Sequence, residues 1–202
     1  MKIAIMDIDG VLADFEGWLV ERVHEKFGAI AAYHNRHLYS WADRWDGKIL
    51  EYASTLTRDK HSYHGLDPIL DGVRFVKELA NLETPILYVT SRPKECHHIT
   101  SRWLQRNVWR FDDAIGLQVV ENKAEYIANN IPVSGVSFIV DDNPDTCAYL
   151  KNHGFLCLCW RQLWNEDVFP AIIPTRDTFF LVENESDHGT DFLSEIKEVK
   201  YG

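Results

Sequence analysis

Two aspartates separated by one residue follow directly after the first apolar run of the chain. The run at residues 2–6 ends in Asp7-Ile8-Asp9-Gly10. At the carboxyl end of a buried strand such carboxylates face the crevice where open α/β sheets bind ligands, and a glycine lets the backbone turn close to a phosphate. One carboxylate can attack phosphorus while the other transfers a proton. The segment therefore predicts a phosphoryl-transfer site to which Gly10 contributes backbone contacts.

Three more polar groups follow apolar runs further along the chain. An aspartate nucleophile needs a divalent cation, donors for the phosphoryl oxygens and an acid for the leaving group. Thr90 and Ser91 offer hydroxyls after a second apolar run, and Lys123 offers a positive charge after a third. Asp141-Asp142 follow a fourth run and suit Mg²⁺, which prefers oxygen ligands.

Each signal alone has an ordinary structural explanation. Asp-x-Asp before glycine is common in turns, a threonine often ends a strand, a lysine often starts a helix, and Asp141-Asp142 can cap the helix that follows. The conjunction of all four carries the information. It favours a phosphoryl-transfer site at which an aspartate nucleophile acts with Mg²⁺.

The order of these groups resembles the four motifs of the haloacid dehalogenase superfamily of aspartate-nucleophile phosphatases, over about residues 1 to 165. The resemblance implies that Asp7 is the nucleophile and that Asp9 is the general acid and then the base, a role that dehalogenase chemistry does not need. It further implies that Thr90 and Lys123 hold the phosphoryl oxygens. The implied Mg²⁺ ligands are the Asp7 carboxylate, the Asp9 backbone carbonyl and Asp142, with Asp141 beside them.

Within the superfamily, the segment Asp9-Gly10-Val11-Leu12-Ala13-Asp14-Phe15 is similar to the 5′(3′)-deoxyribonucleotidases. That similarity implies a 5′-nucleotidase acting on (deoxy)nucleoside monophosphates, with Phe15 stacking on the base. The nucleotidases tend to have proline after Thr-Ser, whereas this chain has Arg92-Pro93. Other phosphatases and the 3′-phosphatase domain of polynucleotide kinases have a similar sequence after Thr-Ser. A polynucleotide 3′-phosphatase or another small-molecule phosphatase is therefore the alternative.

Arg92 has two interpretations. A guanidinium can clamp a phosphate with two parallel hydrogen bonds, or it can pair with a carboxylate in the same geometry. Acidic neighbours are plentiful in residues 141–145, so we favour an ion pair with one of them.

Strands and helices alternate along the chain, which is typical of an α/β fold with a Rossmann-like parallel sheet. We expect strands near residues 2–8, 85–90, 117–120, 137–141 and 155–160, and linking helices at 68–79, 93–107, 123–129 and 144–153. An added edge strand at 179–182 and a short helix at 191–199 are also predicted. The core domain comprises residues 1–14 and 68–202.

Residues 15–67 interrupt this alternation and predict a small helical cap inserted after the first strand. Its first helix starts at Phe15, has an apolar face and ends at Gly28, and should cover the crevice. A second helix is expected near 48–56. Between them, aromatic residues such as Trp41 either sandwich a flat ligand or, as we favour, fill the core of the cap. His34 and His37 are expected to be surface or structural residues rather than metal ligands.

Composition agrees with such an enzyme. A chain of 202 residues with 46% hydrophobic content can bury one core with a modest insertion. No apolar stretch approaches the ~20 residues of a membrane span, and the first strand starts at once, so we expect a cytoplasmic protein without signal peptide. The four cysteines lack paired CxxC spacing, which predicts reduced thiols.

The net charge of −10 and the lack of basic clusters predict a small phosphorylated substrate rather than long nucleic acid. A homodimer is left open. A phospho-signalling receiver would place its acidic pair first and its phosphoacceptor on a middle strand, the reverse of the order here. A non-catalytic phosphate-binding module is the other alternative, and an assay for released phosphate separates it from an enzyme.

Overall fold

A parallel sheet forms the centre of the protein. The computed structural model describes residues 2–33, 35, 38–108, 116–165, 174–176 and 179–181. Five strands lie parallel in the order β3-β2-β1-β4-β5. They are β1 (Ile3–Met6), β2 (Ile86–Thr90), β3 (Leu117–Val119), β4 (Val136–Asp141) and β5 (Cys157–Trp160). The predicted α/β fold class is confirmed.

Two short antiparallel strands extend the sheet beyond β5. β7 (Phe179–Leu181) pairs with β5, and β6 (Pro174–Arg176) pairs with β7. The added strand predicted at 179–182 is therefore present at 179–181, but β6 rather than β7 forms the edge of the described sheet. The helix predicted at 191–199 lies outside the described residues. Cys157 and Cys159 are buried in β5, and all four cysteines are free, as their spacing predicted.

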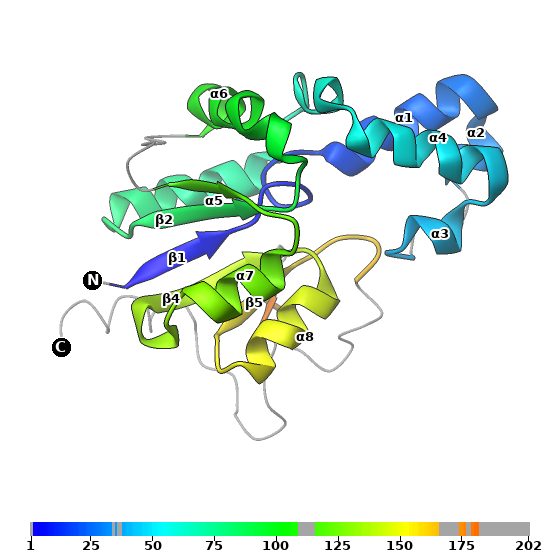
Figure 1. Cartoon of the computed structure of the whole chain (residues 1–202). Coiled ribbons are helices and arrows are strands. Elements are labelled where there is room, and N and C mark those ends of the chain that lie inside the picture. Colours follow the sequence, from blue (N-terminus) through cyan, green and yellow to red (C-terminus); the bar gives the residue numbers. More distant parts are fainter. Residues whose placement is uncertain are drawn as a thin grey trace.

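Helices cover both faces of the sheet (Figure 1). Alternate residues of β1 point to opposite faces, so Ala4 and Met6 belong to one core cluster and Ile5 to the other. The first cluster contains side chains of α5 (Leu70–Asn81) and α6 (His97–Asn107), and the second those of α7 (Lys123–Asn130) and α8 (Pro144–Asn152). Because both faces are buried, the strands are continuous apolar runs.

Two linking helices start differently from the prediction. α5 begins at Leu70 rather than at residue 68, because the backbone before it is tied to the loop after β1: Ile69 N donates to Leu12 O at 2.7 Å. The segment predicted as one helix from residue 93 starts with a 3-10 turn, η2 (Lys94–Cys96), before α6.

The segment between β1 and α5 is helical. It contains α1 (Phe15–Phe27), α2 (Ala29–Tyr33), α3 (Trp41–Arg44), α4 (Gly47–Arg58) and the 3-10 helix η1 (Lys60–Tyr63). Figure 1 shows it as a separate blue-to-cyan layer past the carboxyl end of β1. Asp14 caps α1 by accepting from Gly17 N at 2.8 Å, and Gly28, with φ +90°, ends it.

The two cap helices predicted from the sequence are therefore present, whereas α2, α3 and η1 were not foreseen. His34 and His37 lie outside the described residues. The division into a core domain and a cap domain stays a prediction. Among the described helices, none has both the length and the apolarity that a membrane span requires.

Candidate active site

The loop after β1 brings Asp7 to the carboxyl end of the sheet. Asp7 is buried, and its backbone N–H donates to Val140 O in the neighbouring β4 at 2.9 Å. Gly10 follows with φ +76°, a conformation that side chains disfavour. A Cβ at Gly10 would lie 2.3 Å from Asp142 Oδ2, so the backbone can approach this carboxylate only at a glycine.

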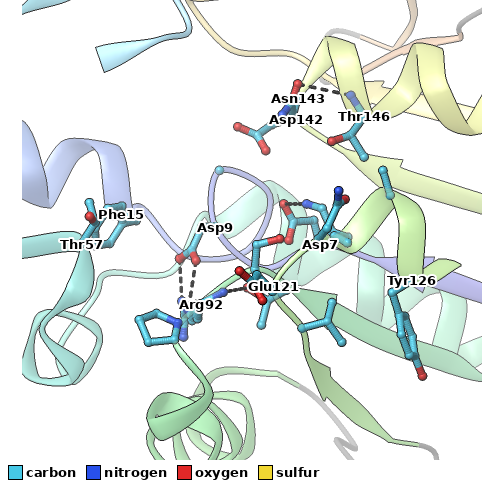
Figure 2. Close-up of a pocket in the computed structure, with 18 of the residues that line it drawn as sticks. Asp7, Asp9, Phe15, Thr57, Arg92, Glu121, Tyr126, Asp142, Asn143 and Thr146 are labelled. Atoms are coloured by element: carbon cyan, nitrogen blue, oxygen red, sulfur yellow. Dashed lines mark hydrogen bonds and ion pairs between the residues drawn. The ribbon is translucent and has the colours of Figure 1, made fainter. Parts of the chain in front are cut away.

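Asp7, Asp141 and Asp142 form one buried acidic cluster. One carboxylate oxygen from each lies within 4.8 Å of the others. Lys123 enters from the start of α7, and its Nζ lies 2.5 Å from Asp7 Oδ2 and 2.7 Å from Asp141 Oδ2. Four side chains from three distant parts of the sequence thus meet at one end of the sheet. Figure 2 shows two of them, Asp7 and Asp142, in the cavity.

Burial and mutual repulsion make the ionised cluster unfavourable. Burial raises the pKa of Asp7 to about 7, with Lys123 opposing and Asp141 adding to the shift. Burial likewise raises the pKa of Asp142 well above its ordinary value, and the charge of Asp7 adds to it. For Lys123, burial lowers the pKa, but the charges of Asp141 and Asp7 outweigh it and the pKa is raised.

The acidic cluster fits a divalent cation. Asp7 Oδ1 is buried and has no hydrogen-bond partner among the described residues. Three buried carboxylates face a single lysine, so negative charge is in excess. Oxygen ligands of this kind match Mg²⁺, and a cation there would compensate the charge that burial disfavours.

Arg92 binds a different carboxylate from the one predicted. Its Nε and Nη2 lie 2.8 Å and 2.6 Å from the two carboxylate oxygens of Asp9 (Figure 2). The predicted pairing within residues 141–145 is therefore wrong. Arg92 follows β2, and β2 neighbours β1 rather than β4, so the loop that carries Asp9 is the nearer one.

The Arg92 side chain is fully buried behind Asp9. Its Nη1 donates to Thr100 Oγ1 on α6 at 3.1 Å, and its guanidinium lies 4.9 Å from the centroid of the Tyr63 ring. The side chain of Asp9 is 27% exposed, so its carboxylate still meets solvent. Arg92 thus fixes Asp9 on one side and leaves the other side toward the cavity.

A cavity of about 1670 Å³ lies between the sheet end and the inserted helices. Nearly all of the predicted site residues line it: Asp7, Asp9, Gly10, Phe15, Trp41, Thr90, Ser91, Arg92, Lys123 and Asp142. Asp141 is not among the lining residues and reaches the site through Lys123. The structure therefore brings the predicted residues together, and their individual roles stay predictions.

The aromatic residues of the inserted helices pack against one another where they border the cavity. The Phe15 ring is 6% exposed and stacks on Tyr63, with centroids 4.9 Å apart and planes at 11°. Trp41 tilts against Phe15 at 6.2 Å. This packing agrees with the favoured interpretation that these rings fill the cap, while stacking of Phe15 on a base stays a prediction.

A buried ion pair inside the inserted helices was missed by the sequence reasoning. Glu16 of α1 pairs with Arg44 of α3 and accepts from Trp41 Nε1 at 3.4 Å. Both charged side chains line the cavity. Charged residues in helices are usually solvated, and no spacing in the sequence marks this pair as buried.

Two amides after β5 were also missed, although they support the site. Gln162 Nε2 donates to Gly10 O at 2.6 Å. Asn165 is fully buried, and its Nδ2 lies 2.9 Å from Asp142 O and 2.7 Å from Trp160 O. The only signal in the sequence is the presence of amides just after the last predicted parallel strand.

Two solved structures with a similar fold are structures of a dehalogenase. The L-2-haloacid dehalogenase from Xanthobacter autotrophicus with chloropropionic acid covalently bound superposes with a TM-score of 0.54 at 16% identity, over 100% of this chain and 99% of that chain. A second structure of that enzyme gives 0.53 at 18% identity with the same coverage. The chain thus has the haloacid dehalogenase fold.

The curated relatives that the chain resembles are nucleotidases. No family model matches the chain. The mitochondrial 5′(3′)-deoxyribonucleotidases of Mus musculus and Homo sapiens are each 25% identical to it over 151 residues. These matches cover 70% of the chain and 64% and 62% of the relatives, less than two thirds of their length. In fold and in the arrangement of its acidic site, the chain is thus similar to hydrolases of the haloacid dehalogenase superfamily.

Proposed function

We propose that the protein is an Mg²⁺-dependent phosphomonoesterase that acts on (deoxy)nucleoside monophosphates. The observation that carries the proposal is the meeting of Asp7 with Lys123, Asp141 and Asp142 at one sheet end, with Asp9 two residues from Asp7 on the same cavity wall. Asp9 favours a phosphatase over a dehalogenase, because only the phosphatase must protonate an alcohol leaving group.

The residues divide the reaction into two steps. Asp7 attacks phosphorus through a carboxylate oxygen, the bond from phosphorus to the leaving oxygen breaks, and Asp9 protonates that oxygen. Asp9 then takes a proton from water, the water attacks the aspartyl-phosphate, and Asp7 is regenerated with release of phosphate. Arg92 holds Asp9 in place in both steps.

The charges of the phosphoryl group are balanced by its surroundings. Lys123 Nζ and the Thr90 hydroxyl donate to the phosphoryl oxygens. Mg²⁺, held by the carboxylates of Asp7 and Asp142 and the carbonyl of Asp9, would supply the positive charge that lets a carboxylate approach a phosphate. The inserted segment 15–67 serves as a cap that limits access of water to the cavity.

Two observations support a nucleotide as the substrate. The curated relatives are deoxyribonucleotidases, and the cavity that holds Asp7 is also lined by the aromatic rings of Phe15, Tyr63 and Trp41. The acidic net charge of −10 disfavours a long polyanion, which makes a polynucleotide 3′-phosphate the weaker candidate.

Phosphate release from a substrate panel tests the proposal. The full chain is assayed with Mg²⁺ on deoxy- and ribonucleoside monophosphates, sugar phosphates and 3′-phosphorylated oligonucleotides. We expect nucleoside monophosphates to give the highest kcat/KM. Equal rates on sugar phosphates would remove the nucleotide part of the proposal.

The nucleophile is tested by Asp7→Asn, with Asp145→Asn as the matched control because Asp145 is exposed in the first turn of α8. Such esters hydrolyse extremely slowly unaided, so Asp7→Asn should lose all measurable turnover while keeping its circular dichroism spectrum. Asp145→Asn should keep its activity. An Asp7→Asn protein with normal turnover would refute the assignment.

A further inference from the structure

The ring of Tyr63 contacts both an aromatic residue of the inserted segment and the arginine that binds Asp9. It stacks on Phe15 with centroids 4.9 Å apart, and the Arg92 guanidinium lies 4.9 Å from its centroid. Arg92 in turn contacts the two carboxylate oxygens of Asp9 at 2.8 Å and 2.6 Å (Figure 2). A continuous series of contacts therefore runs from Phe15 through Tyr63 and Arg92 to the proposed general acid.

Each nitrogen of the Arg92 guanidinium has a polar contact. Nε and Nη2 contact Asp9, and Nη1 donates to Thr100 Oγ1 at 3.1 Å. The donors of a guanidinium form a planar fork, so these contacts hold its edges. Its flat face is free to lie against an aromatic ring, which is a favourable arrangement for arginine. The ring of Tyr63 can therefore restrain the guanidinium in a way that its hydrogen bonds do not.

Burial strengthens the contact between the ring and the cation. The Arg92 side chain is fully buried, and Tyr63 is 5% exposed. Burial lowers the pKa of Arg92, but the charge of Asp9 outweighs it and the pKa is raised, so the side chain stays cationic. A cation against an aromatic face is bound more strongly when both are removed from water.

The Tyr63 ring is held in place by contacts other than Arg92. Its hydroxyl donates to Thr57 O in α4 at 2.7 Å. Three residues further on, Leu66 O accepts a hydrogen bond from Trp103 Nε1 of α6 at 2.7 Å. The ring is thus attached both to the inserted segment and to the helix that carries Thr100, the other partner of Arg92.

We propose that Tyr63 is a positioning residue for the general acid, because its ring holds the guanidinium of Arg92 in the orientation in which it binds both oxygens of Asp9. Tyr63 touches no reacting atom in this role. The inserted segment then contributes to the chemical step as well as limiting access of water to the cavity. The inference rests on the proposed function and deepens it, since it assigns a residue of the inserted segment to the orientation of Asp9.

The test compares two substrates that differ in one bridging atom. They are thymidine 5′-monophosphate and its 5′-thio analogue, in which sulfur replaces the oxygen between phosphorus and the 5′ carbon. The analogue leaves as a thiolate, which needs little help from an acid, whereas the nucleotide leaves as an alkoxide that must be protonated. Contacts with the base are the same in both and cancel in the ratio of their kcat/KM values.

Tyr63→Leu removes the ring and keeps an apolar side chain. We expect kcat/KM to fall roughly three- to tenfold more for thymidine 5′-monophosphate than for the thio analogue, the factor that corresponds to a buried cation–π contact. A merely structural role of Tyr63 would lower both values alike. If Tyr63→Leu does not fold, Tyr63→Met, an unbranched side chain that adapts to the same space, replaces it with the same expectation.

Tyr63→Phe separates the ring from the hydroxyl. It keeps the ring against Arg92 and loses the hydrogen bond to Thr57 O. The melting temperature should fall, while the ratio between the two substrates should stay that of the wild type. A change of this ratio as large as in Tyr63→Leu would show that the hydroxyl rather than the ring is required, and would overturn the inference.

Phe75→Leu is the matched control for the loss of a buried ring. Phe75 of α5 is 5% exposed, lies 6.2 Å from the Phe138 ring between centroids and is not among the cavity-lining residues. This variant should have a lower melting temperature and an unchanged substrate ratio.

The wild type and the variants together separate the inference from the proposed function. A wild type that releases phosphate from neither substrate would overturn the proposed function and the inference with it. A wild type that hydrolyses both, with equal losses in Tyr63→Leu, would overturn the role of Tyr63 and leave the proposed function intact. A larger loss on the nucleotide in Tyr63→Leu, with unchanged ratios in Tyr63→Phe and Phe75→Leu, supports the inference.

Discussion

Replacing Arg92 by leucine should impair catalysis in a way that depends on the leaving group. The substitution removes both contacts that Arg92 makes with Asp9, at 2.8 Å and 2.6 Å. Asp9 stays available as an acid, but its carboxylate is no longer held. We therefore expect the loss to be largest where the leaving group needs protonation most.

The expected losses in Arg92→Leu can be estimated from the burial of the Arg92–Asp9 ion pair and from the contribution of a general acid. Breaking a buried ion pair lowers the free energy of unfolding by about 3–5 kcal/mol. Because the Asp9 side chain is partly exposed, we expect a smaller loss here, roughly 2–3 kcal/mol. A correctly positioned general acid accelerates a reaction about 10²–10⁴-fold. If Asp9 is present but no longer held in position, kcat/KM on an alkyl phosphate should fall roughly 10–100-fold. An aryl phosphate, whose phenolate leaves with little help, should lose less than about tenfold.

The assay compares kcat/KM for p-nitrophenyl phosphate and a nucleoside monophosphate, because kcat/KM reports the step in which the leaving group departs. Thr100→Val is the control, since it removes the hydrogen bond from Arg92 Nη1 to Thr100 Oγ1 and leaves Asp9 paired. We expect similar small losses on both substrates for this variant. Equal losses on both substrates in Arg92→Leu would show that Arg92 acts only through stability, and the reasoning would be refuted.

Two further predictions concern the acidic site. Gly10→Ala should lose most activity and about 1–3 kcal/mol of stability, because φ is +76° and the new Cβ would lie 2.3 Å from Asp142 Oδ2; kinetics and chemical denaturation measure both, and a fully active variant would contradict the account. In the metal-free protein, burial raises the pKa of Asp7 from 3.8 to about 7, so the folded state binds more protons than the unfolded state between these pH values and stability falls as the pH rises. Asp7→Asn should therefore melt at a higher temperature than the wild type at pH 8 in EDTA, with the difference shrinking toward pH 4, and Mg²⁺ should stabilise the wild type more than the variant. Melting temperatures that do not differ at pH 8 would contradict it.

The strands and most of the linking helices could be predicted because the sheet is buried on both faces. Its strands are continuous apolar runs, and polar residues mark where each run ends. Since parallel strands end at the same edge, the meeting of Asp7, Lys123 and Asp141 followed from their places at strand and helix ends. α5 could not be placed as accurately, because its start depends on a long-range contact between Ile69 N and Leu12 O.

The contacts that depend on strand order could not be predicted. Acidic residues both near Asp9 and in residues 141–145 were suitable partners for Arg92, and only the position of β1 between β2 and β4 selects Asp9. The burial of Glu16 and Arg44 depends likewise on how α1 and α3 meet. Pairing between residues far apart in sequence is a property of the assembled fold, and local pattern does not encode it.

Two hydrogen bonds from the turn after β5 affect how substitutions in this chain are interpreted. Gln162 and Asn165 have no part in the proposed chemical steps, yet they donate hydrogen bonds to the carbonyls of Gly10 and Asp142. A shortened protein that stops at Trp160 would retain every group that performs chemistry and would lose the anchors of two of its loops. If such a protein, or one altered at these amides, is inactive, the cause would be that the loops carrying Gly10 and Asp142 are no longer held in position. It would not be the loss of a residue proposed to take part in the reaction.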